Sequence, residues 1–231
     1  MAQVHDGHRD RLRKRFTEEG AETFQEHEIL ELLLFYAIPR KNTNEIAHRL
    51  LERFGNLPQV LEATPADLQS VEGMGEHAAF FLSMIPAISR YYGLAKKKQK
   101  ATMKDLTDCA LYLLDFFVGH AKENVYLLCL DATRNVLACP WVGEGNVNSA
   151  SVPIRRVVEM ALSVNATAVV LAHNHPSGIS TPSIEDVATT KRLAIALEAV
   201  DVILADHVVV ANGQYTSMVK TGRYRPVENV F

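Results

Sequence analysis

The segment from His173 to Asp186 combines two imidazoles, a hydroxyl and a carboxylate at fixed spacing. His173 and His175 follow an apolar, partly β-branched run, residues 168–172, which predicts a buried strand. Alternate residues of a strand point to the same side, so both imidazoles can converge on one ion. Asp186 falls near the start of an expected helix, where the positive helix end favours a carboxylate. Two imidazoles and one carboxylate form the ligand set of a catalytic zinc ion, whose fourth position stays open to water.

Ser183 adds a hydroxyl to this candidate zinc site. The expected helix has Thr181 as its N-cap and Pro182 at its first position. Ser183 precedes Asp186 by three residues, so we expect the two on one helix face. The hydroxyl could then donate a hydrogen bond to an oxyanion that forms beside the metal. Taken alone, Ser183 would more often be a helix cap.

The motif consists of His-x-His, seven further residues, Ser, two residues and Asp. This spacing resembles the signature of the JAMM (MPN-plus) metalloproteases. Nearly the whole chain resembles, more closely, the bacterial RadC family (UPF0758 type), whose carboxy-terminal half is a JAMM domain. The likeness includes the run AHNHPSG, the helix after it, the pair Asp206-His207 and a helical amino-terminal half. It implies a zinc metallopeptidase with one Zn²⁺ per chain, held by His173, His175 and Asp186.

In JAMM enzymes a glutamate on an upstream strand acts as general base, and the segment 123–131 resembles that strand. The resemblance therefore implies Glu123 as the catalytic base, which takes a proton from water and passes it to the leaving amine. Glu144, in a Gly-Glu-Gly turn, and Glu159, in a helical pattern, are rivals for this role.

Two other features flank the motif. RadC proteins usually carry His-Pro-Arg-Glu upstream, whereas this chain has Pro-Ile-Arg-Arg at 153–156, and only Arg155 matches. We expect this departure to change substrate contacts rather than the metal site. For Asp206-His207 we favour a buried pair that ties its strand to a neighbouring loop, over a partner of a zinc ligand.

Composition is typical of an intracellular protein. The chain has 231 residues, a net charge of −3 and three cysteines with no Cys-x-x-Cys pair. An odd number of cysteines suits a reducing cytoplasm and argues against a disulfide framework. The first residues contain no signal-peptide core, and no apolar run approaches a membrane span. We therefore expect a cytoplasmic protein without membrane contact.

A basic run over 96–104 is the expected linker between a helical domain, 1–95, and a mixed α/β domain, 105–231. Apolar periodicity predicts helices over 9–19, 27–36, 44–54, 57–63, 65–71 and 76–92. Beyond the linker it predicts helices over 107–118, 154–164 and 183–199, and strands over 125–131, 136–142, 168–172, 202–210 and after an Asn-Gly turn at 212–213. The fold class is therefore α/β, with a mixed sheet. The resemblance implies a JAMM (cytidine-deaminase-like) domain preceded by a helix-hairpin-helix-type domain.

DNA is a candidate partner of residues 1–104. The stretch 71–79, with Gly73 and Gly75, resembles the hairpin of a helix-hairpin-helix module, whose glycine turn holds a phosphate at a helix start. Glu76 would repel a phosphate, and residues 1–95 hold ten Lys or Arg against fourteen Asp or Glu. A basic cluster could still contact nucleic acid: Arg9, Arg11, Arg13, Lys14 and Arg15. A solvated helix face is the simpler interpretation of this cluster.

Three functions are consistent with these features. The first is a zinc-dependent JAMM-type hydrolase that cuts an unidentified peptide or isopeptide bond. The second is a DNA-repair or replication-associated binding protein whose JAMM domain is accessory or inactive. The third, a zinc deaminase or HNH nuclease, is disfavoured, because a deaminase needs His-x-Glu and a later Pro-Cys-x-x-Cys.

Overall fold

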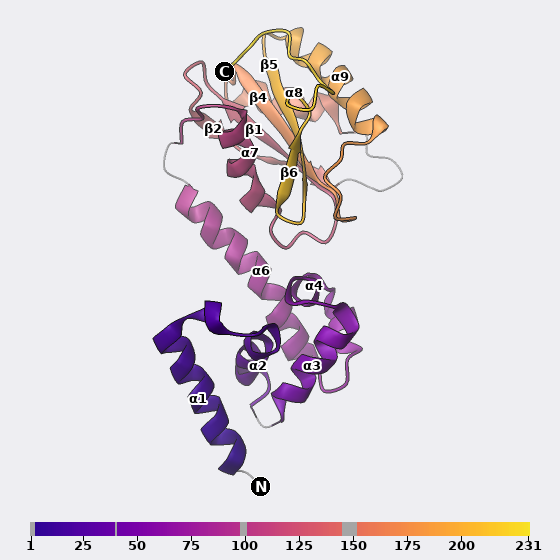
Figure 1. The fold of residues 1–231 in the computed structure, drawn as a ribbon. Helices are drawn as coiled ribbons and strands as arrows, with labels where there is room; N and C mark the ends of the chain where they lie inside the picture. The colour runs from indigo at the N-terminus through magenta and orange to yellow at the C-terminus, as the bar shows by residue number, and fades with distance from the viewer. Residues whose placement is uncertain (1–2, 40, 98–100, 145–151) are drawn as a thin grey trace. The chain divides into compact units, whose positions relative to one another are not determined.

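The computed structural model describes residues 3–39, 41–97, 101–144 and 152–231. The chain divides into two compact units, residues 1–88 and residues 89–231 (Figure 1). Within the described residues, no helix combines the length and the apolar character needed to cross a membrane.

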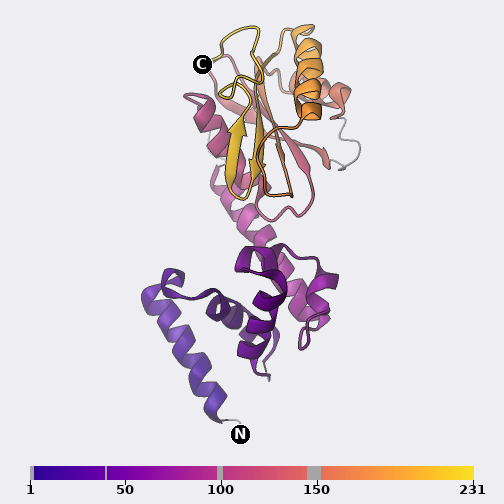
Figure 2. The ribbon, with the colours of Figure 1, turned by 45° about the vertical axis from the view of Figure 1, so that its right-hand side comes forward.

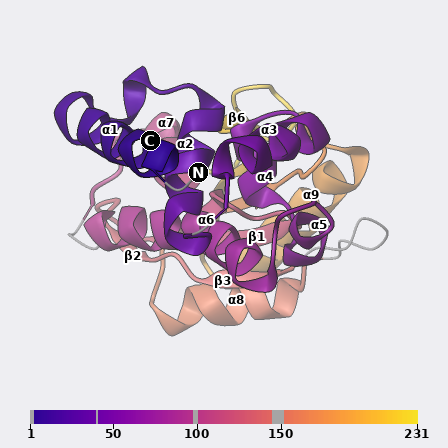
Figure 3. The ribbon, with the colours of Figure 1, turned by 90° about the horizontal axis from the view of Figure 1, so that it is seen from below.

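The described part of the first unit is helical. It contains α1 (Gln3–Glu19), the 3-10 turn η1 (Ala21–Thr23), α2 (Glu26–Ala37), α3 (Thr43–Phe54), α4 (Leu57–Glu62), α5 (Pro65–Gln69) and the beginning of α6 (Glu76–Lys97). The side chains of Asn42, Asn56 and Thr64 cap α3, α4 and α5. Buried apolar side chains of α2, α3 and the helices beside them form the core, and Figure 3 shows α2, α3 and α4 grouped together.

The helices predicted for this unit are present, but two of them extend beyond the predicted range by five residues or more. Helix α1 begins at Gln3, before the predicted start at residue 9, and α6 continues to Lys97. Lysine is a good helix former, so the first lysines of the basic run extend α6. Residues 98–100 of the predicted linker lie outside the described residues. Met103, at the other end of this run, is buried in the core of the second unit, and the boundaries 1–95, 96–104 and 105–231 stay a prediction.

The second unit is a mixed sheet with helices on both faces, as predicted. Its strands are β1 (Asn124–Leu130), β2 (Val136–Ala138), β3 (Trp141–Glu144), β4 (Ala168–Asn174), β5 (Ile203–Ala211) and β6 (Gln214–Ser217). The order is β2-β1-β4-β5-β6, and β3 also pairs with β1. Strands β4 and β5 are parallel, whereas β1 runs antiparallel to β4 and β6 runs antiparallel to β5. Strand β4 is therefore central, and all seven of its residues are buried.

Two separate cores cover the faces of this sheet. Residues of α8 (Ile154–Ser163) and α9 (Ile184–Glu198) pack on one face, together with Val169 and Leu171 of β4. Residues of α7 (Leu106–Leu114) pack on the other face with Val170. Figure 2 shows α9 and α7 on opposite sides of the strands. The alternation of β4 thus directs every second side chain towards α9.

Two predicted elements of this unit differ from the structure. The single strand expected over 136–142 is divided into β2 and β3, because Pro140 has no N–H for the ladder. Its carbonyl oxygen still accepts the N–H of Leu127 at 3.1 Å. The helix expected over 107–118 ends at Leu114 and continues as the 3-10 turn η2 (Asp115–Phe117).

The three cysteines are free, in agreement with the predicted absence of disulfides. Cys109 and Cys129 are buried, and burial raises the pKa of both thiols to about 12. These two thiols are small core groups without thiolate chemistry.

Candidate metal centre

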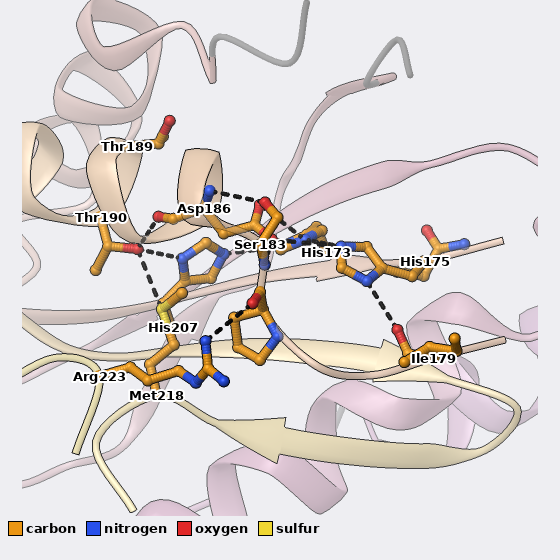
Figure 4. A network of polar contacts seen from close by, with 12 residues as sticks. His173, His175, Ile179, Ser183, Asp186, Thr189, Thr190, His207, Met218 and Arg223 are labelled. Carbon is orange, nitrogen blue, oxygen red and sulfur yellow. Dashed lines mark hydrogen bonds and ion pairs between the residues drawn. The ribbon is translucent and has the colours of Figure 1, made fainter. Parts of the chain in front are cut away.

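The carboxyl end of β4 delivers two histidines to one side of the sheet (Figure 4). His173 continues the row of Val169 and Leu171, so its side chain lies on the α9 face. The N–H of His175 donates to the carbonyl oxygen of Val210 at 2.8 Å, which keeps the chain extended just past the strand end. The two Nε2 atoms are 2.9 Å apart, and the side chains are 4% and 19% exposed. The predicted convergence of the two imidazoles is present in the structure.

Asp186 reaches this pair from the first turn of α9. The helix begins at Ile184 with Ser183 as its N-cap, so the prediction of Thr181 as N-cap and Pro182 as first helical residue is wrong. A reciprocal capping box explains the later start. The hydroxyl of Ser183 accepts the N–H of Asp186 at 3.0 Å, and the Asp186 carboxylate accepts the N–H of Ser183 at 2.7 Å. These two bonds orient the carboxylate, and the hydrogen of the Ser183 hydroxyl is still available for donation.

Two of the three distances between ligand atoms match those of a tetrahedral metal ion, and the third, 2.9 Å between the two Nε2 atoms, is shorter. Oδ1 of Asp186 lies 3.2 Å from Nε2 of His173, and Oδ2 lies 3.4 Å from Nε2 of His175. Ligands at the usual zinc distances, about 2.0–2.1 Å, are separated by about 3.3–3.4 Å in a tetrahedral site. Among the described residues, these three form the only group of three or more His, Cys, Asp or Glu side chains with ligand atoms this close.

The charge of the group also suits a cation. Burial opposes ionisation of Asp186, but the contacts of its carboxylate with the imidazoles of His173 and His175 outweigh burial and hold the pKa of the carboxyl well below its ordinary value. The hydrogen bond with Asp186 raises the pKa of His175 despite its partial burial. A carboxylate that is 13% exposed and remains ionised favours a positive charge at the position between the three side chains.

Both histidines are held through the ring nitrogen that faces away from Asp186. Nδ1 of His175 lies 2.8 Å from the carbonyl oxygen of Ile179, to which it can only donate. Nδ1 of His173 lies 2.8 Å from Nε2 of His207. In metal sites, a ligating histidine typically donates its other N–H to such a partner, which leaves a lone pair for the metal. The donor set therefore fits zinc.

The pair Asp206-His207 has two separate roles. Asp206 hydrogen-bonds Ser217 and the N–H of Val219, which is the predicted tie to a neighbouring loop. His207 instead contacts His173. This contact agrees with the less favoured alternative, in which the pair supplies a partner of a metal ligand. An irregularity in the β4–β5 pairing separates the two roles, because Val169 pairs with Leu204 while Val170 pairs with Asp206. The extra residue, Ala205, reverses the alternation and turns His207 towards α9.

Glu123 lies one residue before the start of β1. Val125 pairs with His173 in the antiparallel ladder, so the same register continued by two residues places Glu123 opposite His175. Opposed residues of an antiparallel pair project from the same face. The charge of Glu123 also contributes to the raised pKa of His175.

Asn174, the residue between the two histidines, points to the other side of the strand and holds the segment of Glu123. Its Oδ1 accepts the N–H of Asn124 at 2.8 Å, and its Nδ2 donates to the carbonyl oxygen of Lys122 at 3.1 Å. Our sequence reasoning missed this residue, although its place inside the His-x-His motif was a signal.

The two rival glutamates are engaged in ion pairs. Glu144 pairs with Lys122 at 3.1 Å on the strand beside Asn124. Glu159 pairs with Arg155 at 2.8 Å on the exposed side of α8. Of the three glutamates, Glu123 has the register position closest to the histidines.

Comparison with known proteins places the chain in a family. Residues 103–223 match the family described as RadC-like JAB domain, and residues 6–80 match the family described as UPF0758 N-terminal. A UPF0758 protein of Fusobacterium nucleatum is 34% identical over 223 residues, covering 94% of this chain and 96% of that protein. The chain belongs to the UPF0758 family. A UPF0758 protein of Rhodobacter capsulatus is 35% identical over 206 residues, which cover 89% of this chain and 96% of that protein.

Membership confirms the resemblance to RadC proteins and the JAB (MPN) fold of the second unit. The JAB domain family includes metallohydrolases, and its members often bind zinc. The departure at 153–156 lies at the start of α8 within the RadC-like domain, where Arg155 is 92% exposed and pairs with Glu159. Arg156 lies over the ring of Trp141, 5.8 Å from its centroid.

The basic cluster of the UPF0758 N-terminal region is largely engaged within its own unit. Arg9 donates to the carbonyl oxygens of residues 38, 39 and 41, where α2 ends. Arg13, Lys14 and Arg15 pair with carboxylates of Asp10, Glu18 and Glu28. These contacts agree with the simpler interpretation, a solvated helix face.

The glycine turn resembling a helix-hairpin-helix connects α5 to α6. Gly73 has a φ of +95°, and a Cβ there would lie 2.9 Å from the side chain of Ile46. Glycine is thus required by the backbone and by packing, with or without DNA. DNA binding through residues 1–104 stays a prediction.

Proposed function

We propose that this protein is a zinc-dependent hydrolase of JAMM type that cleaves a peptide or isopeptide bond. The observation that carries the proposal is the convergence of His173, His175 and Asp186, whose facing nitrogen and oxygen atoms lie 2.9–3.4 Å apart, each histidine being fixed through its Nδ1. Three protein ligands leave one position for water, as in catalytic rather than structural zinc sites.

When bound, zinc would supply Lewis acidity that activates water and polarises the substrate carbonyl. Glu123 would take the proton of the attacking water and deliver it to the leaving nitrogen, because its register position faces His175. The Ser183 hydroxyl would donate its free hydrogen to the carbonyl oxygen as negative charge develops there. Partial burial of the three ligands would strengthen these charge interactions by excluding water.

The experiment compares cleavage of quenched peptide and isopeptide libraries by the zinc-loaded and zinc-stripped full chain. We expect cleavage only with zinc, and loss of cleavage in Asp186→Asn. Glu185→Gln is the matched control, since Glu185 is the exposed neighbour of Asp186 on α9. Cleavage that persists in Asp186→Asn, or that Glu185→Gln abolishes equally, would contradict the proposal.

A further inference from the structure

A buried chain of hydrogen bonds runs behind the candidate metal centre (Figure 4). Nδ1 of His173 lies 2.8 Å from Nε2 of His207, and Nδ1 of His207 lies 2.6 Å from the hydroxyl of Thr190. His207 is 1% exposed and Thr190 is 0% exposed, so protein groups rather than solvent must satisfy both. The chain ends at the carbonyl oxygen of Asp186, 2.6 Å from the Thr190 hydroxyl.

The direction of each bond follows from the Thr190 end. The Thr190 hydroxyl has one hydrogen and three possible acceptors in reach: the Asp186 carbonyl oxygen, Nδ1 of His207 and the sulfur of Met218 at 3.3 Å. The carbonyl oxygen of Asp186 can only accept, and at 2.6 Å it would repel the Thr190 oxygen unless the hydrogen lay between them, so the Thr190 oxygen is left to accept from His207. Nδ1 of His207 therefore carries its proton. In a neutral imidazole, Nε2 then has only a lone pair, and it must accept the N–H of His173.

We propose that His207 is a positioning residue that holds His173 in the tautomer protonated at Nδ1, with Nε2 free for the metal. This inference rests on the proposed metal site. The opposite tautomer of His173 would place two lone pairs against each other at Nδ1 and block the metal-facing nitrogen with a proton. The same chain reaches the main chain of Asp186, so it links two of the three ligands across β4, β5 and α9.

The irregularity at Ala205 is the structural basis of this arrangement. Without the extra residue, Asp206 rather than His207 would follow Leu204 on the face covered by α9. A carboxylate there could not donate to Thr190 and would change the charge of the site.

The test measures zinc affinity of the full chain by competition with a chromophoric chelator. His207→Phe removes the acceptor in a similar volume, and we expect zinc to bind about 10–100-fold more weakly. His207→Gln can return an amide oxygen to the position of Nε2, so it should recover affinity relative to Phe. Ser217→Ala is the control, because Ser217 bonds Asp206 one residue away and does not contact His173. It should bind zinc as the unaltered chain does.

A second measurement keeps the inference testable if His207→Phe does not fold. Nitrogen-15 spectra of the zinc-free, unaltered chain should show His207 protonated at Nδ1 and bare at Nε2, and Thr190→Val should weaken zinc binding. Protonation at Nε2, or equal zinc affinity in the Phe and unaltered chains, would overturn the inference. If the Phe variant and the unaltered chain bind zinc equally, the unaltered chain still binds zinc and the proposed function stands. Absence of zinc from the unaltered chain would instead overturn the proposed function together with this role.

Discussion

Val125 pairs with His173 across the β1–β4 ladder, and this register, continued by two residues beyond the ladder, would place Glu123 opposite His175. A carboxylate in that position can exchange a proton with water beside the metal ligands without being a ligand itself.

We therefore expect Glu123→Gln to retain zinc and to lose catalysis by about 10²–10⁴-fold in turnover, the usual contribution of a general base. Turnover is measured on any substrate found with the peptide libraries, and zinc by metal analysis of the same sample. Glu144→Gln, which removes the partner of Lys122, is the control and should keep turnover. Equal losses in both variants would argue against a specific role for Glu123.

Asn174 holds the segment that carries Glu123. Asn174→Ala leaves the N–H of Asn124 and the carbonyl oxygen of Lys122 without this partner. A buried polar group left unpaired costs about 1–3 kcal/mol, so the free energy of unfolding should fall by that amount. Turnover should fall as well, because Glu123 is released, while zinc content is maintained.

Urea denaturation of the zinc-loaded chain measures this loss. Asn229→Ala, a substitution of an exposed asparagine, is the control and should leave stability within the scatter of surface substitutions, about 0.5 kcal/mol. Zinc loss in Asn174→Ala at unchanged stability would contradict the assigned role.

Ser183 combines two roles that substitution can separate. Ser183→Ala removes the cap of α9 and should cost about 0.5–2 kcal/mol of stability. Ser183→Asn keeps a capping side chain of similar strength and should restore stability. The longer asparagine side chain would not place a donor at the position of the Ser183 hydroxyl, so we expect turnover to stay low in both variants. Full turnover in Ser183→Asn would reduce Ser183 to a helix cap.

Asp131 gives a pH dependence that is independent of the metal. Hydrogen bonds from Asn135 and Thr133 lower the pKa of Asp131 from 3.8 to about 2 in the folded chain. Since the folded pKa is the lower one, this contribution to stability is complete above pH 3.8 and is lost as the pH falls towards 2. Thermal unfolding from pH 5 to pH 2 should therefore show a smaller decrease in Asp131→Asn. Identical acid profiles would show that the turn does not stabilise the ionised form.

For DNA, we expect weak binding by the full chain. The cations of α1 are mostly paired within their unit, and few remain to neutralise phosphates. Titration of labelled branched DNA should give a dissociation constant no tighter than about 10⁻⁶ M at physiological salt. Nanomolar binding with a steep salt dependence would favour the DNA-associated function.

The three residues of the candidate metal centre could be predicted because their geometry is local. Two alternating histidines at a strand end and an aspartate in the next helical turn are connected by only ten residues between His175 and Asp186. The strand, the turn and the helix each follow from neighbouring residues, so the convergence could be anticipated before any fold was known.

The groups behind the ligands depend on long-range register, which the sequence does not reveal. The irregularity at Ala205 decides which of Asp206 and His207 faces α9, and it arises from pairing with β4. Thr190 follows Asp186 by one helical turn, a signal that would have been usable once His207 was assigned to that face. The capping box likewise makes Ser183 rather than Thr181 the N-cap of α9, and its hydrogen bonds form only in the folded turn.

The most direct test of the metal centre is elemental analysis of tag-free protein after reconstitution with zinc at neutral pH. The double variant His173→Ala, His175→Ala and the single variant Asp186→Asn are measured beside it. The account predicts about one zinc ion per unaltered chain and little in either variant. Zinc at background level in the unaltered chain, or equal zinc in all three proteins, would contradict it.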